Sequence, residues 1–264
     1  MKPIPHADDL SFAKHLADIA AKVTLDQFGS RLPVRLKSDS TPVTSVDTAA
    51  ELAVREALAT HLPDDGILGE EGGPRPGQNG RTWVIDPIDG TSMFAEGIPL
   101  WTTLICLRTD GQPTVAVADA PALNERYHAT LRGGAFRNDR RIHASSVSGL
   151  ESAFVLHAAI EEFSRGTGVE ALQRVITVAR ASRGIGDAWA HLLVARGAAD
   201  VLVEQGPCFE WDWAATSLIV TEAGGALTRL EGGRPTPGCN LLVTNGVLDV
   251  QVRNALYADE HAPD

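Results

Sequence analysis

A strand that ends in an acidic turn near residue 86 constrains this chain more than any other segment. Residues 83–85 are apolar and typical of the end of a buried strand. Pro87 and Gly90 then force the chain to turn at once, so the strand delivers Asp86 and Asp89 to one edge. Carboxylate oxygens are the ligands that Mg²⁺ prefers. The sequence therefore predicts a metal site at this edge.

The same turn offers further polar groups. An exposed carbonyl such as that of Ile88 could add a third oxygen ligand, and Gly90 lets the backbone approach a ligand beside the hydroxyl of Thr91. Asp-Pro and Asp-Gly are also ordinary turn formers, so the two acids alone could belong to a solvated turn. Acidic segments elsewhere in the chain bear on this choice.

Two more acidic segments favour the metal site. Glu70 and Glu71 follow a short apolar run at residues 66–68, which predicts carboxylates just past another strand. Asp212 opens an apolar helical run that ends before Gly224, although it could simply be the N-cap of that helix. The set of acids, rather than any single member, indicates a shared site.

Five ordered segments resemble the inositol monophosphatase superfamily of Mg²⁺-dependent, lithium-sensitive phosphatases. They are Lys37-x-Asp39-x-Thr41 with Asp47, Glu70-Glu71, residues 86–91 with Phe94, Arg183-x-x-Gly186-Asp187, and Trp211-Asp212 with residues 222–225. The resemblance spans nearly the whole chain. Within the superfamily the chain is most similar to the histidinol-phosphatase branch, through residues 97–105, 120–123, 186–187 and 244–245.

The resemblance implies a layered αβαβα sandwich of the inositol monophosphatase and fructose-1,6-bisphosphatase type. Residues 1–145 would form an N-terminal α+β half that carries most metal ligands. Residues 146–264 would form a C-terminal α/β half of the same compact unit, carrying Asp212 and the residues for substrate specificity. Hydrophobic periodicity by itself predicts only mixed α and β structure.

That periodicity predicts the order of the elements. A first helix begins at Asp8 or Asp9 and runs to about Phe28, and a second begins near Asp47 and ends before Pro63. Strands at 101–107, 114–120 and 126–131 then form an antiparallel meander, with a hairpin turn at Asp110-Gly111. After a boundary at 145–149, strands at 153–156 and 200–204 alternate with helices at 169–179 and 188–195.

The resemblance also implies which residues hold metal. It implies two or three Mg²⁺ ions. Such ions would supply charge neutralisation, which the reaction needs because a phosphate monoester and its attacking nucleophile are both electron-rich. Glu70, Asp86 and the Ile88 carbonyl would bind one ion. Asp86, Asp89 and Asp212 would share a second.

Other roles follow from the same resemblance. Glu70 and Thr91 would orient the attacking water, and Asp47 would polarise Thr91 or help to hold a third ion. Asp89, Gly90 and Thr91 would meet the phosphate, the last two through their backbone amides. No Ser, Cys or His nucleophile is needed for this chemistry.

The rest of the substrate would contact a set of residues from the C-terminal half, namely Arg183, Gly186, Asp187, Ala188 and Glu204. Asp187 and Glu204 would form an acidic wall, which suits a substrate with an ammonium group or many hydroxyls. Asp187 could instead cap a helix, Glu204 could close a strand, and Arg183 could be a surface residue. His191 lies on an apolar helix and is expected to be packed rather than catalytic.

The sequence departs from the family pattern in two places. Ser92 and Met93 stand where the family commonly has Lys or Thr followed by Asn. One extra residue stands between Glu204 and Asp212, which makes Glu210 an alternative to Glu204 as the acid that meets the substrate.

The charge balance limits the partners. The formal net charge is −11, and without a Lys/Arg stripe this argues against nucleic acid or an anionic membrane. A small anionic ester fits, because bound Mg²⁺ inverts the local potential. The three cysteines include no Cys-x-x-Cys pair, and the N-terminus lacks the apolar core of a signal peptide. We expect a cytoplasmic homodimer with reduced thiols and no membrane span.

Together the sequence predicts a Mg²⁺-dependent phosphatase of a small phosphate monoester, with histidinol phosphate from histidine biosynthesis as the first choice. A phosphatase of inositol, aminocyclitol or other sugar phosphates is the alternative, favoured by Ser92 and Met93. A non-enzymatic regulator on the same fold is a third interpretation. The clustered acids argue against it, because a site without activity has no physical need for them.

Overall fold

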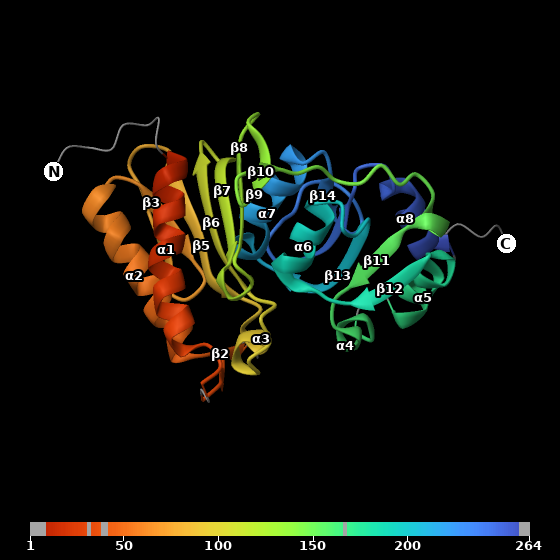
Figure 1. Ribbon diagram of the computed structural model, residues 1–264, viewed down its shortest axis with the longest axis horizontal. Helices are drawn as coiled ribbons and strands as arrows, with labels where there is room; N and C mark the ends of the chain where they lie inside the picture. The colour runs from red at the N-terminus through yellow and green to blue at the C-terminus, as the bar shows by residue number, and fades with distance from the viewer. Residues whose placement is uncertain (1–8, 31–32, 38–41, 166–167, 259–264) are drawn as a thin grey trace.

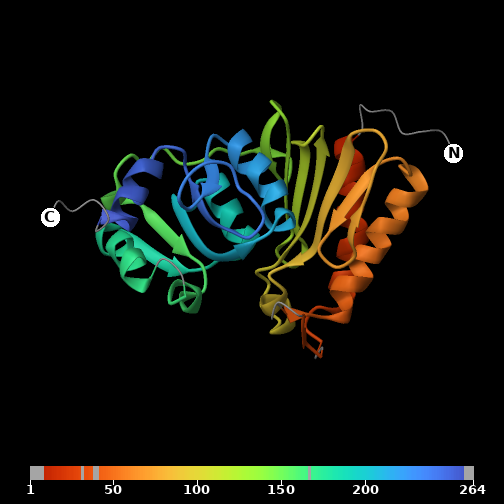
Figure 2. The ribbon, with the colours of Figure 1, turned by 180° about the vertical axis from the view of Figure 1, so that it is seen from behind.

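The computed structural model describes residues 9–30, 33–37, 42–165 and 168–258. Figure 1 shows five layers in succession: two helices, a sheet, two helices, a second sheet and an outer group of helices. Figure 2 shows the same succession from behind. The αβαβα sandwich expected from the sequence is confirmed. Asp8, Asp39 and Thr41, which entered the sequence predictions, lie outside the described residues.

The larger sheet is built from β3 (Gly66–Gly69), β4 (Gly73–Arg75), β5 (Arg81–Asp89), β6 (Thr102–Thr109), β7 (Gln112–Ala120), β8 (Glu125–Thr130), β9 (Gly134–Arg137) and β10 (Arg140–Arg141). The order is β10-β9-β8-β7-β6-β5-β3-β4. Neighbours from β5 to β10 are antiparallel, which confirms the meander. Asp110 and Gly111 join β6 to β7 with φ of 50° and 80°, the left-handed backbone of a tight hairpin.

Alternation along the central strands divides their apolar side chains between the two faces of this sheet. The helices on its outer face are α1 (Asp9–Gln27) and α2 (Ser45–His61). Trp83 and Ile85 of β5 pack with these helices, whereas Val84 packs in the middle layer. The face toward the middle layer is rich in alanine, including Ala116 and Ala118, which lets helices pack closely against it.

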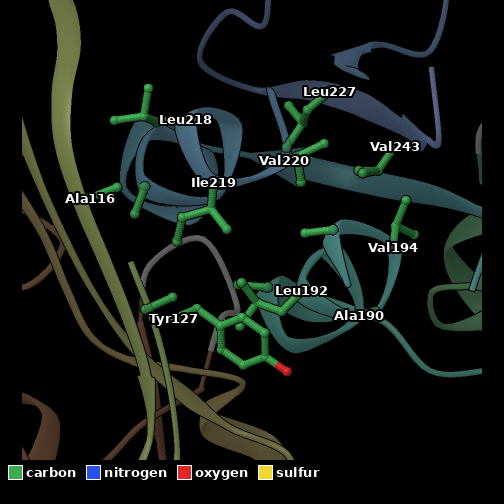
Figure 3. Packing of buried hydrophobic residues seen from close by; sticks show 14 of the residues in the cluster. Ala116, Tyr127, Ala190, Leu192, Val194, Leu218, Ile219, Val220, Leu227 and Val243 are labelled. Carbon is green, nitrogen blue, oxygen red and sulfur yellow. The ribbon is translucent and has the colours of Figure 1, made fainter. Parts of the chain in front are cut away.

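The middle layer consists of α6 (Asp187–Ala195) and α7 (Glu210–Glu222). Figure 3 shows their apolar side chains, such as Leu192 and Ile219, between Tyr127 of the larger sheet and Val243 of the smaller one. Both helices come from the C-terminal part of the chain. They nevertheless cover a sheet that comes from the N-terminal part.

The smaller sheet is built from β11 (Phe154–His157), β12 (Ala181–Gly184), β13 (Val201–Cys208), β14 (Ala226–Arg229) and β15 (Cys239–Thr244), in the order β12-β11-β13-β15-β14. On its outer side lie α4 (Ile160–Phe163), α5 (Val169–Val178) and α8 (Asp249–Leu256). The remaining elements are the pair β1 (Arg35–Leu36) and β2 (Pro42–Val43), the short helix α3 (Thr91–Ala95), and the 3-10 helices η2 (Pro121–Leu123) and η3 (Leu150–Ser152). Among the described residues, no helix has both the length and the apolar character needed to span a bilayer.

The expected helices and strands are present, and β5 and β13 continue well past their predicted ends. Strand β5 does not end at Ile85 but continues to Asp89, because a bulge accommodates Pro87 within it. Strand β13 does not end at Glu204 but continues to Cys208 through another bulge, at the segment where the sequence has its extra residue. Bulges of this kind carry no strong signal in local hydrophobicity.

Candidate active site

The bulge in β5 brings Asp86 and Asp89 to the same side of the strand. In a regular strand, side chains three residues apart point to opposite faces. Asp86 pairs with Leu104 and Asp89 with Thr102, so β5 has one more residue than β6 in this interval. Pro87 lies in the bulge, where its missing N–H costs no ladder hydrogen bond. Both carboxylates therefore face one site.

Gly90 makes the turn that ends β5. Its φ of 84° lies in the left-handed region, which glycine adopts without strain. A Cβ at this position would lie 3.1 Å from the carbonyl oxygen of Leu100 and 3.4 Å from Oδ2 of Asp187. Glycine is thus required by the turn, and the Leu100 carbonyl leaves little room for a larger residue.

Thr91 is held at the start of α3 by two oxygen atoms. Its Oγ1 lies 3.0 Å from Oδ1 of Asp47 and 3.0 Å from the carbonyl oxygen of Ile88. Asp47 is buried in the first turn of α2, where its Oδ2 accepts the backbone N–H and the hydroxyl of Thr44. The structure thus places the predicted residues Asp47, Ile88 and Thr91 in contact.

Asp212 reaches the same site from α7. It is the third residue of the helix rather than its N-cap, which is Phe209, and its Oδ2 accepts the Phe209 backbone N–H at 2.6 Å. This capping bond fixes the carboxylate at the N-terminal end of α7. One carboxylate oxygen from each of Asp86, Asp89 and Asp212 lies within 4.8 Å of the other two.

Glu70 lies beside this cluster on the loop after β3. Its charge is among the neighbours that raise the pKa of Asp86. Lys37 donates at 2.6 Å to Glu70 Oε1 and at 2.6 Å to Glu71 Oε1. The sequence analysis included Lys37 in a motif but gave it no role. It also missed Glu51, whose buried carboxylate accepts the Glu71 backbone N–H at 2.7 Å and so positions the loop.

Burial and mutual repulsion make this cluster unfavourable as a set of free carboxylates. Burial, with the neighbouring charges of Glu70, Asp89 and Asp212, raises the pKa of Asp86 well above its usual value. Burial likewise raises the pKa of Asp89 and of Asp212, and their acidic neighbours add to the effect. Burial also raises the pKa of Glu70, although Lys37 opposes it.

This donor set fits a divalent cation. Carboxylate and carbonyl oxygens are hard ligands, and the three Asp residues converge closely enough to share one ion. A bound cation would also offset the repulsion that raises their pKa values. The Ile88 carbonyl lies beside this group, where it accepts the Thr91 hydroxyl, and the charge of Glu70 acts on Asp86.

A cavity opens over these residues. Its lining consists of Pro42, Asp86, Ile88, Asp89, Gly90, Thr91, Ser92, Asp187 and Asp212. Ser92 is exposed there, so one of the two residues that depart from the family pattern at this turn lies in the wall of the cavity. Asp187, which the sequence analysis predicted to contact the substrate, belongs to the same wall.

The N-terminus of α6 meets the site through two backbone amides. The N–H of Asp187 donates to Glu204 Oε1 at 3.0 Å, and the N–H of Ala188 donates to Asp89 Oδ2 at 2.8 Å. Gly186 is the N-cap, so Asp187 is not the capping residue that the sequence allowed. Burial and the nearby Glu204 raise the pKa of Asp187 to about 6.

Three other candidates lie away from the cavity wall. Arg183 is exposed on the edge strand β12, where its guanidinium donates to the Ser182 carbonyl. Glu210 forms an ion pair with Arg108, on the side of α7 that faces a different cavity. Glu204 is buried in β13, and burial opposes its ionisation, but His191 lowers its pKa.

Comparisons with known proteins decide the family. The model of the inositol monophosphatase family matches residues 7–260. The chain belongs to this family. It is therefore a phosphoric monoester hydrolase of the inositol monophosphatase type, as the resemblance of its motifs implied.

Several relatives within the family cover most of the chain. A histidinol-phosphatase of Mycobacterium tuberculosis is 41% identical over 95% of this chain and 98% of its own length. An inositol-1-monophosphatase of Rhizobium meliloti is 36% identical over 81% of this chain and 82% of its own length. Among solved structures, the inositol monophosphatase of Thermotoga maritima superposes with a TM-score of 0.87 at 29% identity, covering 95% of this chain and 97% of that one.

Proposed function

We propose that this family member is a Mg²⁺-dependent phosphatase that hydrolyses histidinol phosphate, as in histidine biosynthesis. The observation that carries the proposal is the convergence of Asp86, Asp89 and Asp212 in one cavity with Thr91 and Asp187. The three clustered Asp residues and Thr91 suit metal and phosphate, and Asp187 suits a cationic end of the same small molecule. The histidinol-phosphatases of M. tuberculosis and Streptomyces coelicolor, at 41% and 40% identity, support this choice of ester.

The acids would hold the metal as the sequence analysis predicted. In the proposal Glu70, Asp86 and the Ile88 carbonyl hold one Mg²⁺, and Asp86, Asp89 and Asp212 hold a second. When bound, Mg²⁺ supplies positive charge for the phosphate oxygens and the leaving oxygen. In the proposal Lys37 keeps its ion pair with Glu71 and so holds the loop after β3 in place.

Thr91 would orient the attacking water together with Glu70. The single hydrogen of the Thr91 hydroxyl is directed to Asp47 or to the Ile88 carbonyl. Its lone pairs remain able to accept a hydrogen bond from water. The first amides of α3, at Gly90 and Thr91, precede the intrahelical hydrogen bonds and so can donate to the phosphate.

An aminocyclitol, inositol or other sugar phosphate is the second candidate substrate. The exposed Ser92 hydroxyl in the cavity wall favours it, because a hydroxyl can hydrogen-bond a polyol. The 36% identical inositol-1-monophosphatase of R. meliloti also supports it. A non-enzymatic role on this fold has no comparable observation in its favour.

A phosphate-release assay tests the proposal. The purified protein is given histidinol phosphate, inositol phosphates and fructose bisphosphate, each with Mg²⁺ and with a chelator. We expect the highest kcat/KM for histidinol phosphate, no turnover with the chelator, and inhibition by millimolar Li⁺ as the resemblance implies. Preference for a polyol phosphate would favour the second candidate, and full turnover in chelator would overturn the metal assignment.

Two parts of the proposal concern the state of the protein in the cell. We propose a homodimer, which sedimentation of the purified protein tests, and a cytoplasmic location, which fractionation of the source cells tests. Monomeric sedimentation at micromolar concentration would contradict the first.

A further inference from the structure

Behind Asp187 lies a chain of buried hydrogen bonds that the proposed chemistry does not use. His191 Nε2 lies 2.6 Å from Glu204 Oε2, and Glu204 Oε1 accepts the Asp187 backbone N–H at 3.0 Å. On its other side, His191 Nδ1 lies 2.8 Å from Oγ1 of Thr216. The exposed fractions of His191, Glu204 and Thr216 are 1%, 7% and 0%. This series of hydrogen bonds therefore links α7, α6 and β13 to the wall of the cavity.

Asp187 needs such support because its backbone is strained. Its φ of 59° lies in the left-handed region, which non-glycine residues adopt at a cost unless their surroundings hold them there. Two buried carboxylates do so, since Glu204 accepts the N–H of Asp187 and Asp89 accepts the N–H of Ala188. In this conformation the Asp187 carboxylate lies close to Gly90 and lines the cavity.

Both carboxylate oxygens of Glu204 are used in these hydrogen bonds. An ionised carboxylate can only accept hydrogen bonds, so His191 Nε2 donates to it. Each oxygen of Glu204 therefore has a donor from the chain itself. Among the described residues, those that line the cavity include Asp187 but not Glu204. Asp187 is thus the acid that a substrate can reach, and Glu204 stands behind it.

We propose that His191 is a positioning residue for substrate selection: by holding Glu204 it fixes Asp187 where Asp187 pairs with an ammonium group on the substrate. The proposal rests on the proposed phosphatase function for the identity of the ester. It adds a residue that the sequence analysis treated as ordinary packing, and it moves Glu204 from substrate contact to support.

The experiment compares two esters that differ in one group: histidinol phosphate and the analogue with hydrogen in place of its amino group. The variants are His191→Leu, which removes both ring nitrogens, and His191→Gln, whose amide can still donate to Glu204. Thr216→Val removes the second partner of the ring. The matched control is Ser217→Ala, which removes a neighbouring hydroxyl on α7 that donates to its own helix at Ala214.

We expect His191→Leu to raise KM for the amino ester on the order of tenfold, the effect of one lost buried hydrogen bond, with little change for the analogue. The KM ratio of the amino ester to the analogue should rise less in Thr216→Val than in His191→Leu. In His191→Gln the ratio should return most of the way to the wild-type value, and in Ser217→Ala it should be unchanged. Equal changes in KM for both esters, or no rescue by Gln, would reject the positioning role.

A structural measurement separates this proposal from the phosphatase proposal. A crystal structure of His191→Leu should show residue 187 outside the left-handed region, or its carboxylate moved away from Gly90. An unchanged Asp187 would overturn the inference even if the enzyme hydrolyses histidinol phosphate. If the wild-type protein hydrolyses neither ester, the proposed substrate fails and with it the ammonium-reading role, whereas a displaced Asp187 would still support the positioning contact.

Discussion

Replacing Asp86 by Asn should abolish turnover and yet make the metal-free protein more stable. Asp86 is 2% exposed and one of its oxygens lies within 4.8 Å of oxygens from Asp89 and Asp212. At that separation two unit charges repel by about 3 kcal/mol with the effective dielectric constant of 20 that suits protein sites. Asparagine keeps the shape and can still accept the Ile88 backbone N–H, which bonds Asp86 Oδ1 at 2.9 Å.

The wild-type protein avoids part of this repulsion by binding protons. The stability gained by Asp86→Asn should therefore be smaller than the summed repulsion of Asp86 with Asp89 and Asp212. We expect Asp86→Asn to raise the free energy of unfolding in chelator by about 1–3 kcal/mol, or roughly 2–10 °C in Tm. Adding Mg²⁺ should stabilise the wild-type protein by mass action and leave the variant nearly unchanged. The order of the two Tm values should therefore reverse between chelator and saturating Mg²⁺.

Differential scanning calorimetry in chelator and in Mg²⁺, together with a phosphate-release assay, measures both effects. Asp64→Asn is the matched control, because Asp64 is exposed and the substitution changes charge in the same way. A lower Tm for Asp86→Asn than for wild type in chelator would refute the repulsion argument. Wild-type turnover by the variant would refute the metal assignment.

The pH dependence has a definite sign. The pKa values of Asp86, Asp89 and Asp212 are raised above their usual value of 3.8. At pH above 3.8, the folded protein in chelator therefore holds more protons than the unfolded chain. The free energy of unfolding from these groups therefore falls as pH rises above that value. We expect Mg²⁺ to suppress this fall, and Asp86→Asn to reduce it in chelator.

Three further substitutions or treatments test other contacts. Gly90→Ala should lower Tm and kcat, because φ of 84° strains alanine by about 1–3 kcal/mol; normal values of both would contradict the need for glycine at this turn. Glu210→Gln breaks the ion pair with Arg108 and should leave the KM ratio of an amino ester to its deaminated analogue unchanged, whereas a large change would make Glu210 the substrate acid. Cys239, half-buried, should react with iodoacetamide faster than Cys106, whose burial raises its pKa to about 12; mass spectrometry of the native protein measures the order.

Much of the fold could be predicted from the sequence because periodicity and turn residues act locally. The meander, the hairpin at Asp110 and the helices beginning at Asp9 and near Asp47 all follow from such signals. The sequence motif also predicted that Asp86 and Asp212 share a site, which their separation in the structure supports. Lithium sensitivity, metal identity and the substrate stay predictions.

What could not be predicted depends on contacts between distant segments. A bulge between Asp86 and Asp89 is determined by the pairing of β5 with β6, and no local pattern displays that pairing. The hydrogen bonds of Glu204 join three elements, so the sequence could not tell whether this acid closes a strand, meets the substrate or supports Asp187. His191 looked like ordinary packing for the same reason.

The position of α7 in the middle layer has a consequence for how this enzyme can be divided. The helix carries Asp212 to carboxylates of the larger sheet and, with α6, covers the alanine-rich face of that sheet. A fragment ending near residue 145 would lack one of the three clustered carboxylates and would expose that apolar face to water. The N-terminal and C-terminal parts are therefore not modules that could be exchanged or expressed separately, and a deletion that removed α7 would take stability and catalysis together.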